Sequence, residues 1–276
     1  AGSGGRPPLV ARPRPDRVPL SLAQQRMWFV NRLDPESAVY NIPLGLRLTG
    51  DLDVDALRAA LTDVLARHES LRTRFPDSVD GPSQVVLDVD EVAAHVDLDA
   101  EIVSDDQDLH GRIVAAASAG FDVTAAPPVR VHLFRIGDAA EHVLLLVVHH
   151  ISADGSSMAP LAADLVRAYA ARVSGAEPDW SPLPVQYADF ALWQRAVLGV
   201  EEDPESPAAD QARYWRENLA GLPDLLEFPL DRPRPSVRSI EGGAVETTIP
   251  AEIQSALTDL ARETDTTLFM VMHAAF

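Results

Sequence analysis

The stretch that decides the fold is Val143-Leu-Leu-Leu-Val-Val-His149-His150-Ile-Ser-Ala-Asp154-Gly155. Its first six residues are all apolar, which is typical of a strand buried on both faces of a sheet. The polar residues that follow predict a loop, and a helical pattern begins directly after them. A loop between a buried strand and a helix is a place where α/β proteins present polar groups to ligands.

The segment after the loop predicts an amphipathic helix. Apolar residues fall along one helical face at Met158, Leu161, Leu165 and Tyr169. We expect Ser156 or Ser157 to cap this helix, because serine accepts hydrogen bonds from the free N–H groups of a first turn. Pro160 is expected in the first turn, where proline is tolerated. The whole unit is therefore predicted as strand, polar loop and helix.

The residues upstream supply a partner strand and two helices. Val129 to Ile136 alternates apolar and polar residues, and the turn signal Gly137-Asp138 predicts a hairpin with the buried strand. Helical spacing predicts helices from Asp53 to His68 and from Asp105 to Ala119. The carboxylate-rich segment Asp88 to Asp108 is expected to be a solvated surface.

The residues downstream predict a connection followed by further helices. Ser174 to Pro184 is rich in proline, glycine and acidic residues and is typical of a hinge. The elements expected after it are helices at Val185 to Leu198 and Ala208 to Ala220, a strand near Ala244 to Ile249, a helix at Ala251 to Thr264, and a last helix capped by Asp265 or Thr266.

The two adjacent histidines cannot serve the same function, because neighbouring residues on a strand point to opposite faces. One imidazole is expected to face a cleft and the other to lie in the interior. Asp154 is placed either to bind an Arg elsewhere in the fold or to orient a histidine. The alternative is a pair of interior histidines beside a turn aspartate. No complete metal-ligand set and no Gly-x-Ser-x-Gly elbow accompany them, which argues against a metal site and a serine hydrolase.

Composition excludes several classes of function. The 276 residues have a formal net charge of −19, 46% hydrophobic residues and no cysteine. The carboxylate excess argues against nucleic acid and against an anionic membrane surface as partners. Without cysteine there is no disulfide and no thiolate nucleophile, which fits a cytoplasmic location. No apolar run reaches the roughly 20 residues that span a bilayer.

Four ordered motifs resemble those of the condensation domains of nonribosomal peptide synthetases. The segment His149 to Gly155 matches the family's His-His-x-x-x-Asp-Gly core. The other three are Ser21-Leu-Ala-Gln24-Gln-Arg26-Met-Trp28, Arg67-His-Glu-Ser-Leu-Arg72-Thr-Arg-Phe75 and Tyr187-Ala-Asp189-Phe-Ala-Leu-Trp193. The resemblance runs from about Val18 to the end. Ser156 departs from it, because many members have Trp there.

The resemblance implies an α/β fold of the chloramphenicol acetyltransferase-like type, with two lobes and a tunnel between them. We expect residues 1–16 to be a flexible linker or an expression remnant and residues 17–175 to form the N-terminal lobe. Residues 176–276 would then be the inter-lobe connection and the truncated start of the C-terminal lobe. The first lobe is expected to be complete and the second only begun, because the family's later motifs would fall beyond Phe276.

The resemblance also assigns roles to residues. It implies that His150 faces the tunnel as the catalytic residue, while His149 supports the loop and Asp154 pairs with an Arg of the other lobe. Gly155 would keep the backbone close to the reacting carbonyl. Structural roles are expected for the remaining motif residues, which are Ser21, Gln24, Arg26, Arg67, Arg72, Tyr187, Asp189 and Trp193.

The function implied is amide formation between a donor acyl or peptidyl thioester and an acceptor aminoacyl thioester, in antibiotic or siderophore biosynthesis. The resemblance implies that the domain itself binds no cofactor, because phosphopantetheine would arrive on the upstream and downstream carrier proteins. An adjacent adenylation domain and the C-terminal lobe are further expected partners. An L-configured donor is the expected subtype, and a domain that accepts a D-configured donor is the close alternative. The alternatives are an epimerization-type domain, although the usual Trp-Arg run is missing, and a non-catalytic binding module of the same fold.

Overall fold

The computed structural model describes residues 6–96, 98–137, 140–225, 227, 229–236 and 245–275. By its contacts the chain divides into two units, Ala1–Ala220 and Gly221–Phe276. Two of the expected features extend beyond the described residues, since Asp138 of the hairpin turn and Ala244 of the last strand are not among them.

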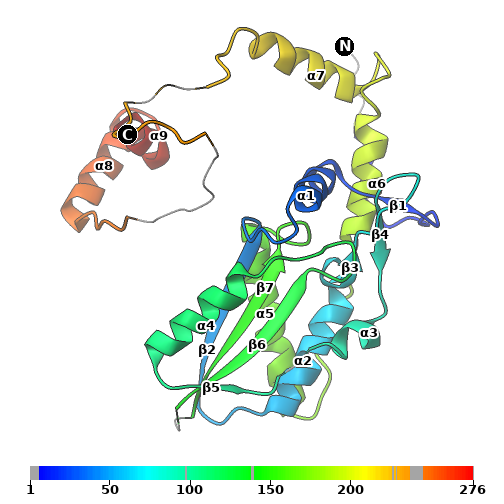
Figure 1. Ribbon diagram of the computed structural model, residues 1–276, viewed down its shortest axis with the longest axis vertical. Coiled ribbons are helices and arrows are strands. Elements are labelled where there is room, and N and C mark those ends of the chain that lie inside the picture. Colours follow the sequence, from blue (N-terminus) through cyan, green and yellow to red (C-terminus); the bar gives the residue numbers. More distant parts are fainter. Residues whose placement is uncertain are drawn as a thin grey trace. The chain divides into compact units, whose positions relative to one another are not determined.

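A four-stranded sheet forms the centre of the first unit (Figure 1). Its strands, in spatial order, are β2 (Asn41–Thr49), β7 (Glu141–His149), β6 (Val129–Ile136) and β5 (Glu101–Val103). β7 is antiparallel to both of its neighbours, whereas β5 and β6 are parallel. The predicted hairpin of β6 and β7 is confirmed.

β7 separates two hydrophobic clusters, because its side chains alternate between the two faces of the sheet. Leu144, Leu146 and Val148 belong to one cluster, packed with helices α2 (Val54–Arg67) and α5 (Gly155–Val173). Val143, Leu145 and Val147 belong to the other, which includes Leu109 of α4 (Asp106–Ser118). All six are nearly inaccessible to solvent. The prediction of a strand buried on both faces is therefore confirmed.

The flanking helices are those that the spacing of apolar residues predicts. Asp53 caps α2 by accepting a hydrogen bond from the backbone N–H of Ala56 at 2.9 Å. Arg172 of α5 donates two hydrogen bonds to Asp63 of α2, at 2.6 and 2.7 Å, and so ties the two helices together. α4 lies on the opposite side of the sheet from this pair (Figure 1).

The same unit contains a second group of elements. Its parts are the short strands β1 (Val18–Pro19), β4 (Ser83–Val86) and β3 (Thr73–Arg74), helix α1 (Leu22–Leu33), the 3-10 turn η1 (Glu69–Arg72), α6 (Tyr187–Leu198) and α7 (Pro207–Asn218). α6 contacts β1 and η1. The predicted helices near 185–198 and 208–220 are confirmed.

The acidic segment is not simply a solvated surface, so that prediction is wrong. It contains the short helix α3 (Val89–Ala93) and the edge strand β5. Val92, Leu98 and Val103 within it are buried in the two clusters. The described carboxylates of this segment stay at the surface, while Val92, Leu98 and Val103 pack inward. These three apolar residues are spaced too irregularly to give a clear period.

The start of α5 also differs from the prediction. Asp154, and not a serine, is the N-cap residue, since its backbone is extended and its carboxylate accepts from the N–H of Ser157. Pro160 lies inside the helix beyond its first turn, where it removes one backbone hydrogen bond.

The second unit contains α8 (Ala251–Glu263) and α9 (Leu268–Ala275). Thr267, and neither Asp265 nor Thr266, caps α9, because its Oγ1 accepts from the N–H of Met270 at 3.2 Å. Residues 245–249 form no strand, which corrects the prediction. Val245 is fully exposed, and no described segment pairs with these residues. No described helix of either unit is long and apolar enough to cross a membrane.

Candidate active site

The polar loop begins where β7 ends. His149 is the last residue of the strand and only 1% exposed, whereas the next residue, His150, is exposed. His149 follows Val147 by two positions and therefore continues the row of side chains that faces the second cluster. The alternation of the strand thus separates one interior imidazole from one that solvent can reach.

The interior imidazole is held in one form. Its Nδ1 accepts a hydrogen bond from the backbone N–H of Ile151 at 3.1 Å, so the ring proton is on Nε2. The ring of Phe121 lies edge-on to it, with 6.2 Å between centroids. Burial, assisted by the neighbouring charge of His150, lowers the pKa of His149 to about 4. His149 is therefore neutral near pH 7.

The exposed imidazole belongs to a residue anchored by its backbone. The N–H of His150 donates to the carbonyl of Tyr40 at 2.8 Å. Tyr40 directly precedes β2, and the register that pairs Asn41 with His149 brings it beside the loop. The loop is closed by a hydrogen bond from the N–H of Ser152 to the carbonyl of His149 at 3.0 Å. The imidazole of His150 makes no hydrogen bond with the described residues and can meet a ligand.

Asp154 closes the loop at the start of α5. Its carboxylate accepts from both the N–H and the hydroxyl of Ser157, at 2.9 and 2.7 Å. The hydroxyl in turn accepts from the N–H of Asp154 at 3.0 Å. These bonds, the side-chain bond first, lower the pKa of Asp154. The structure gives it no Arg partner among the described residues and no hydrogen bond to a histidine. A Cβ added at Gly155 would meet no described atom within 4 Å.

The residues of the first and fourth motifs meet at a junction away from this loop. Ser21 caps α1 and exchanges hydrogen bonds with Gln24, at 2.9 and 3.1 Å. The Ser21 hydroxyl is also bonded to that of Tyr187 at 3.0 Å. Gln24 donates to Gln84 of β4 at 3.3 Å. These four side chains tie α1, α6 and β4 together.

Asp189 extends the same junction to the N-terminal segment. Arg14 donates to both oxygens of this buried carboxylate, at 3.0 and 3.2 Å, and to Glu69 at 2.7 Å. Burial alone would raise the pKa of Asp189, but the bonds from Arg14 and from the N–H of Gln186 lower it. Arg14 lies within the segment predicted as a linker and is nonetheless bound to the folded unit.

The remaining motif residues each take a separate place. Arg67 donates to Asp164 at 2.9 Å and lies over the ring of Trp180. Arg72 donates to the carbonyls of Leu65 and Leu87. The other two are Trp193, which donates to the carbonyl of Pro7 at 2.6 Å, and Arg26, which is exposed and makes no ion pair with the described residues.

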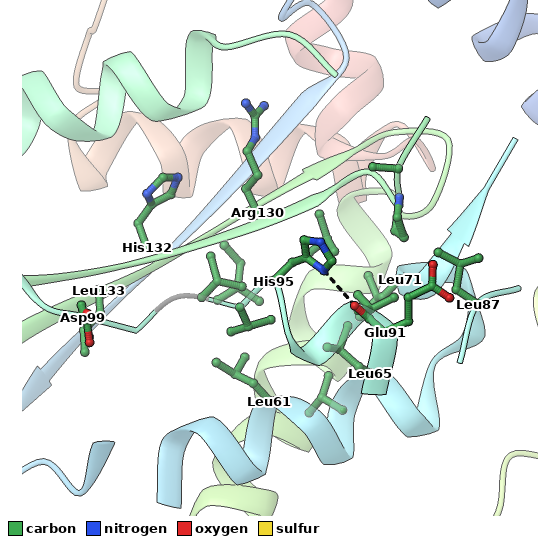
Figure 2. A pocket seen from close by; sticks show the side chains of 18 of the residues that line it. Leu61, Leu65, Leu71, Leu87, Glu91, His95, Asp99, Arg130, His132 and Leu133 are labelled. Carbon is green, nitrogen blue, oxygen red and sulfur yellow. Dashed lines mark hydrogen bonds between the residues drawn. The ribbon is translucent and has the colours of Figure 1, made fainter. Parts of the chain in front are cut away.

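A cavity of about 570 Å³ lies elsewhere, between α2, α3 and β6 (Figure 2). Leu61 and Leu65 of α2 line one side of it, and His95 contacts the carbonyl of Glu91 at another. Neither histidine of the polar loop lines this cavity, so we assign it no part in the chemistry. No group of three metal-ligating side chains occurs among the described residues.

Comparison with known proteins identifies the family to which this chain is similar. The family model of the condensation domain matches residues 15–276. The chain is 51% identical over 270 residues to a probable non-canonical nonribosomal peptide synthetase of Salinispora arenicola, covering 98% of this chain and 3% of that protein. It is 48% identical over 272 residues to an isonitrile lipopeptide synthase of Mycobacterium tuberculosis, covering 97% and 11%.

Among solved structures, a complex of the X-domain and OxyB from teicoplanin biosynthesis is similar, with a TM-score of 0.84 and 38% identity. The match covers 96% of this chain and 57% of that one. The likeness to it, to the starter condensation domain of rhizomide synthetase and to a four-domain nonribosomal peptide synthetase confirms the predicted α/β fold of the chloramphenicol acetyltransferase-like type. Because the family model matches nearly the whole sequence, this chain belongs to the condensation domain family.

Proposed function

We propose that His150 is the catalytic residue of a domain that joins a donor acyl or peptidyl thioester to an acceptor aminoacyl thioester. The observation that carries this proposal is the contrast between the two adjacent imidazoles. His149 is buried, neutral and fixed by Ile151, while His150 is exposed with its ring free of hydrogen bonds to the described residues. Membership of the condensation domain family supports the same reaction class.

The chemistry requires little beyond placement and one proton transfer. The acceptor amine attacks the thioester carbonyl, a C–N bond forms, the C–S bond breaks, and the donor thiol leaves with a proton that balances the one lost by the amine. Holding both reactants in place can supply up to about 7–11 kcal/mol of the barrier. The imidazole of His150 either accepts the amine proton, worth about 10²–10⁴-fold in rate, or holds the amine by a hydrogen bond.

The partners in this proposal carry the substrates. Both thioesters would be borne on phosphopantetheine arms of an upstream and a downstream carrier protein, with an adenylation domain alongside. The second wall of the tunnel would come from the C-terminal lobe of the same domain. We propose an L-configured donor, on the strength of the sequence from His149 to Met158 and of the motif that begins at Ser21.

The test uses the complete domain with matched donor and acceptor aminoacyl-carrier proteins. Mass spectrometry should detect dipeptidyl carrier with the natural sequence and should show a loss of about 10²-fold or more with His150→Ala. His110→Ala, at an exposed histidine of α4, is the matched control and should keep full activity. Equal product from His150→Ala would refute the catalytic assignment. Solvent deuterium entering the α-carbon without condensation would show epimerization instead.

A partner-binding module is the second candidate, favoured by one observation. The similar X-domain from teicoplanin biosynthesis was solved in a complex with OxyB. If the complete domain forms no dipeptidyl carrier yet binds a folded partner protein in calorimetric titration, and if that binding survives His150→Ala, this second function is the correct one.

A further inference from the structure

Tyr40 lies outside the four motifs and contacts the polar loop at His150. It stands just before β2, far from the loop in sequence, and is half-buried. Its carbonyl accepts the N–H of His150 at 2.8 Å. The pairing of β2 with β7 begins at Asn41 and His149. Tyr40 and His150 are therefore opposite each other, one position beyond the end of this ladder.

The side chain of Tyr40 contacts both imidazoles. Its ring is perpendicular to that of His150, at 88° with 6.3 Å between centroids. It is tilted by 56° against the ring of His149, at 6.0 Å. Edge-to-face arrangements at such distances are the favoured geometry of aromatic pairs. Phe121 lies edge-on to His149 as well, so the buried imidazole has an aromatic neighbour of its own.

The backbone bond alone does not orient the imidazole of His150. A fixed backbone still leaves the staggered wells of the first side-chain torsion and a broad second torsion. No hydrogen bond to a described residue selects among them. The Tyr40 ring occupies one side of the imidazole and therefore restricts the orientations that the ring can adopt. The Tyr40 hydroxyl makes no hydrogen bond with the described residues, so the contact is made by the ring.

We propose that Tyr40 is a positioning residue for His150, whose aromatic ring holds the imidazole in the orientation needed for condensation. The proposal rests on the catalytic function proposed above for His150. A displacement of about 1 Å at a reacting group can cost on the order of 10²-fold in rate. Loss of the Tyr40 ring should therefore lower turnover without removing any group that touches the substrate.

The kinetic test compares Tyr40→Ala with Tyr40→Phe in the complete domain. Tyr40→Ala should lower kcat by about 10-fold to 100-fold while KM for the acceptor carrier changes by less than about 2-fold. Tyr40→Phe keeps the ring and should stay within about 3-fold of the natural kcat. Tyr214→Ala, at an exposed tyrosine of α7, is the matched control. An unchanged kcat in Tyr40→Ala, or an equal loss in Tyr40→Phe, would overturn the proposal.

A second measurement separates this proposal from the function of His150. In the complete domain labelled at histidine Cε1, the signal missing from His150→Ala identifies His150 by nuclear magnetic resonance. Tyr40→Ala should move that signal to the position of a free histidine, whereas Tyr40→Phe should leave it in place. If the signal does not move in Tyr40→Ala, the positioning role is wrong. If it moves but His150→Ala remains active, only the catalytic function fails, and the contact stands.

Discussion

Nδ1 of His149 and the backbone N–H of Ile151 share a hydrogen bond of 3.1 Å. It uses the lone pair that would otherwise take up a proton, and the ring is 1% exposed. Burial, with the nearby charge of His150, lowers the pKa of His149 to about 4, against about 6.5 in an unfolded chain. The folded loop therefore contains His149 in its neutral form.

Acid should destabilise the fold through this residue. Between about pH 6.5 and 4 the unfolded chain binds the proton and the folded chain does not, so the free energy of unfolding falls as pH drops. We expect the titration of His149 to lower the free energy of unfolding by about 2–3 kcal/mol between pH 7.5 and 4.5. Urea unfolding at the two pH values measures this difference. His149→Asn does not titrate, and its amide oxygen can accept from Ile151. An equal loss in that variant would contradict the prediction.

Removing Arg14 should leave Asp189 without its cation. The carboxylate side chain is 3% exposed, and among the described residues only the N–H of Gln186 would remain bonded to it. We expect Arg14→Ala to lower the free energy of unfolding by about 1–3 kcal/mol. Arg12→Ala, at an exposed residue of the same segment, should change it by less than about 0.5 kcal/mol. Similar effects of the two variants would show that the ion pair contributes nothing.

The ion pair of Arg14 and Asp189 predicts a second pH dependence of stability, which arises from a carboxylate and not from an imidazole. The pKa of Asp189 is lowered in the folded state, so its contribution is present above the unfolded value, about 3.9, and is lost as pH falls through the folded value. The midpoint of thermal unfolding should therefore fall less steeply from pH 5 to pH 2 in Asp189→Asn than in the natural sequence. A parallel fall would contradict the assigned role of Arg14.

Asp154 should stabilise α5 as a cap whatever its part in catalysis. Asp154→Ala removes the acceptor of the Ser157 N–H and should cost about 1 kcal/mol in unfolding free energy. Asp154→Asn retains a capping oxygen and should cost less. Ser156→Ala is the matched control, because Ser156 does not cap the helix. If Ser156→Ala costs as much as Asp154→Ala, the assigned cap is wrong.

The middle of β7 should be the most sensitive part of the core. Leu145 is fully buried in the second cluster, and Leu145→Ala should cost about 2–5 kcal/mol in unfolding free energy. Val79→Ala, at a fully exposed position, should change it by less than about 0.5 kcal/mol. Chemical unfolding of both variants at one pH tests the difference. A small effect at Leu145 would mean that the strand is not packed as described.

The parts of the fold that the sequence predicts are those with a regular local period. The unbroken apolar run from Val143 to Val148 identifies a buried strand, and the helical spacing of apolar residues after Asp53 identifies a helix. β2 went unpredicted because Pro43 and Gly45, two residue types that disfavour strands, stand between its alternating apolar residues, and because its pairing with β7 connects distant residues. Residues 245–249 have the composition of a strand but no described partner, and pairing rather than composition makes a strand.

The candidate site also has a part that the sequence predicts and a part that it does not. Alternation along a strand was enough to separate the two imidazoles, one interior and one accessible. Sequence could not show that Asp154 bonds to Ser157, because three residues compete for the cap of one helix. Tyr40 had no local signal at all: its contact with His150 follows from the register of β2 against β7, which only the folded chain reveals.

The bond between Arg14 and Asp189 has a consequence for exchanging domains between peptide synthetases. A recombination junction placed at Val18, where the first strand starts, would replace Arg14 by whatever the donor supplies while keeping the buried Asp189. Where the incoming residue is not a cation, the hybrid would carry an unmatched charge in α6. A junction upstream of Pro7 keeps both Arg14 and the carbonyl of Pro7. Asp189 and Trp193 of α6 then retain their hydrogen-bond partners in the hybrid.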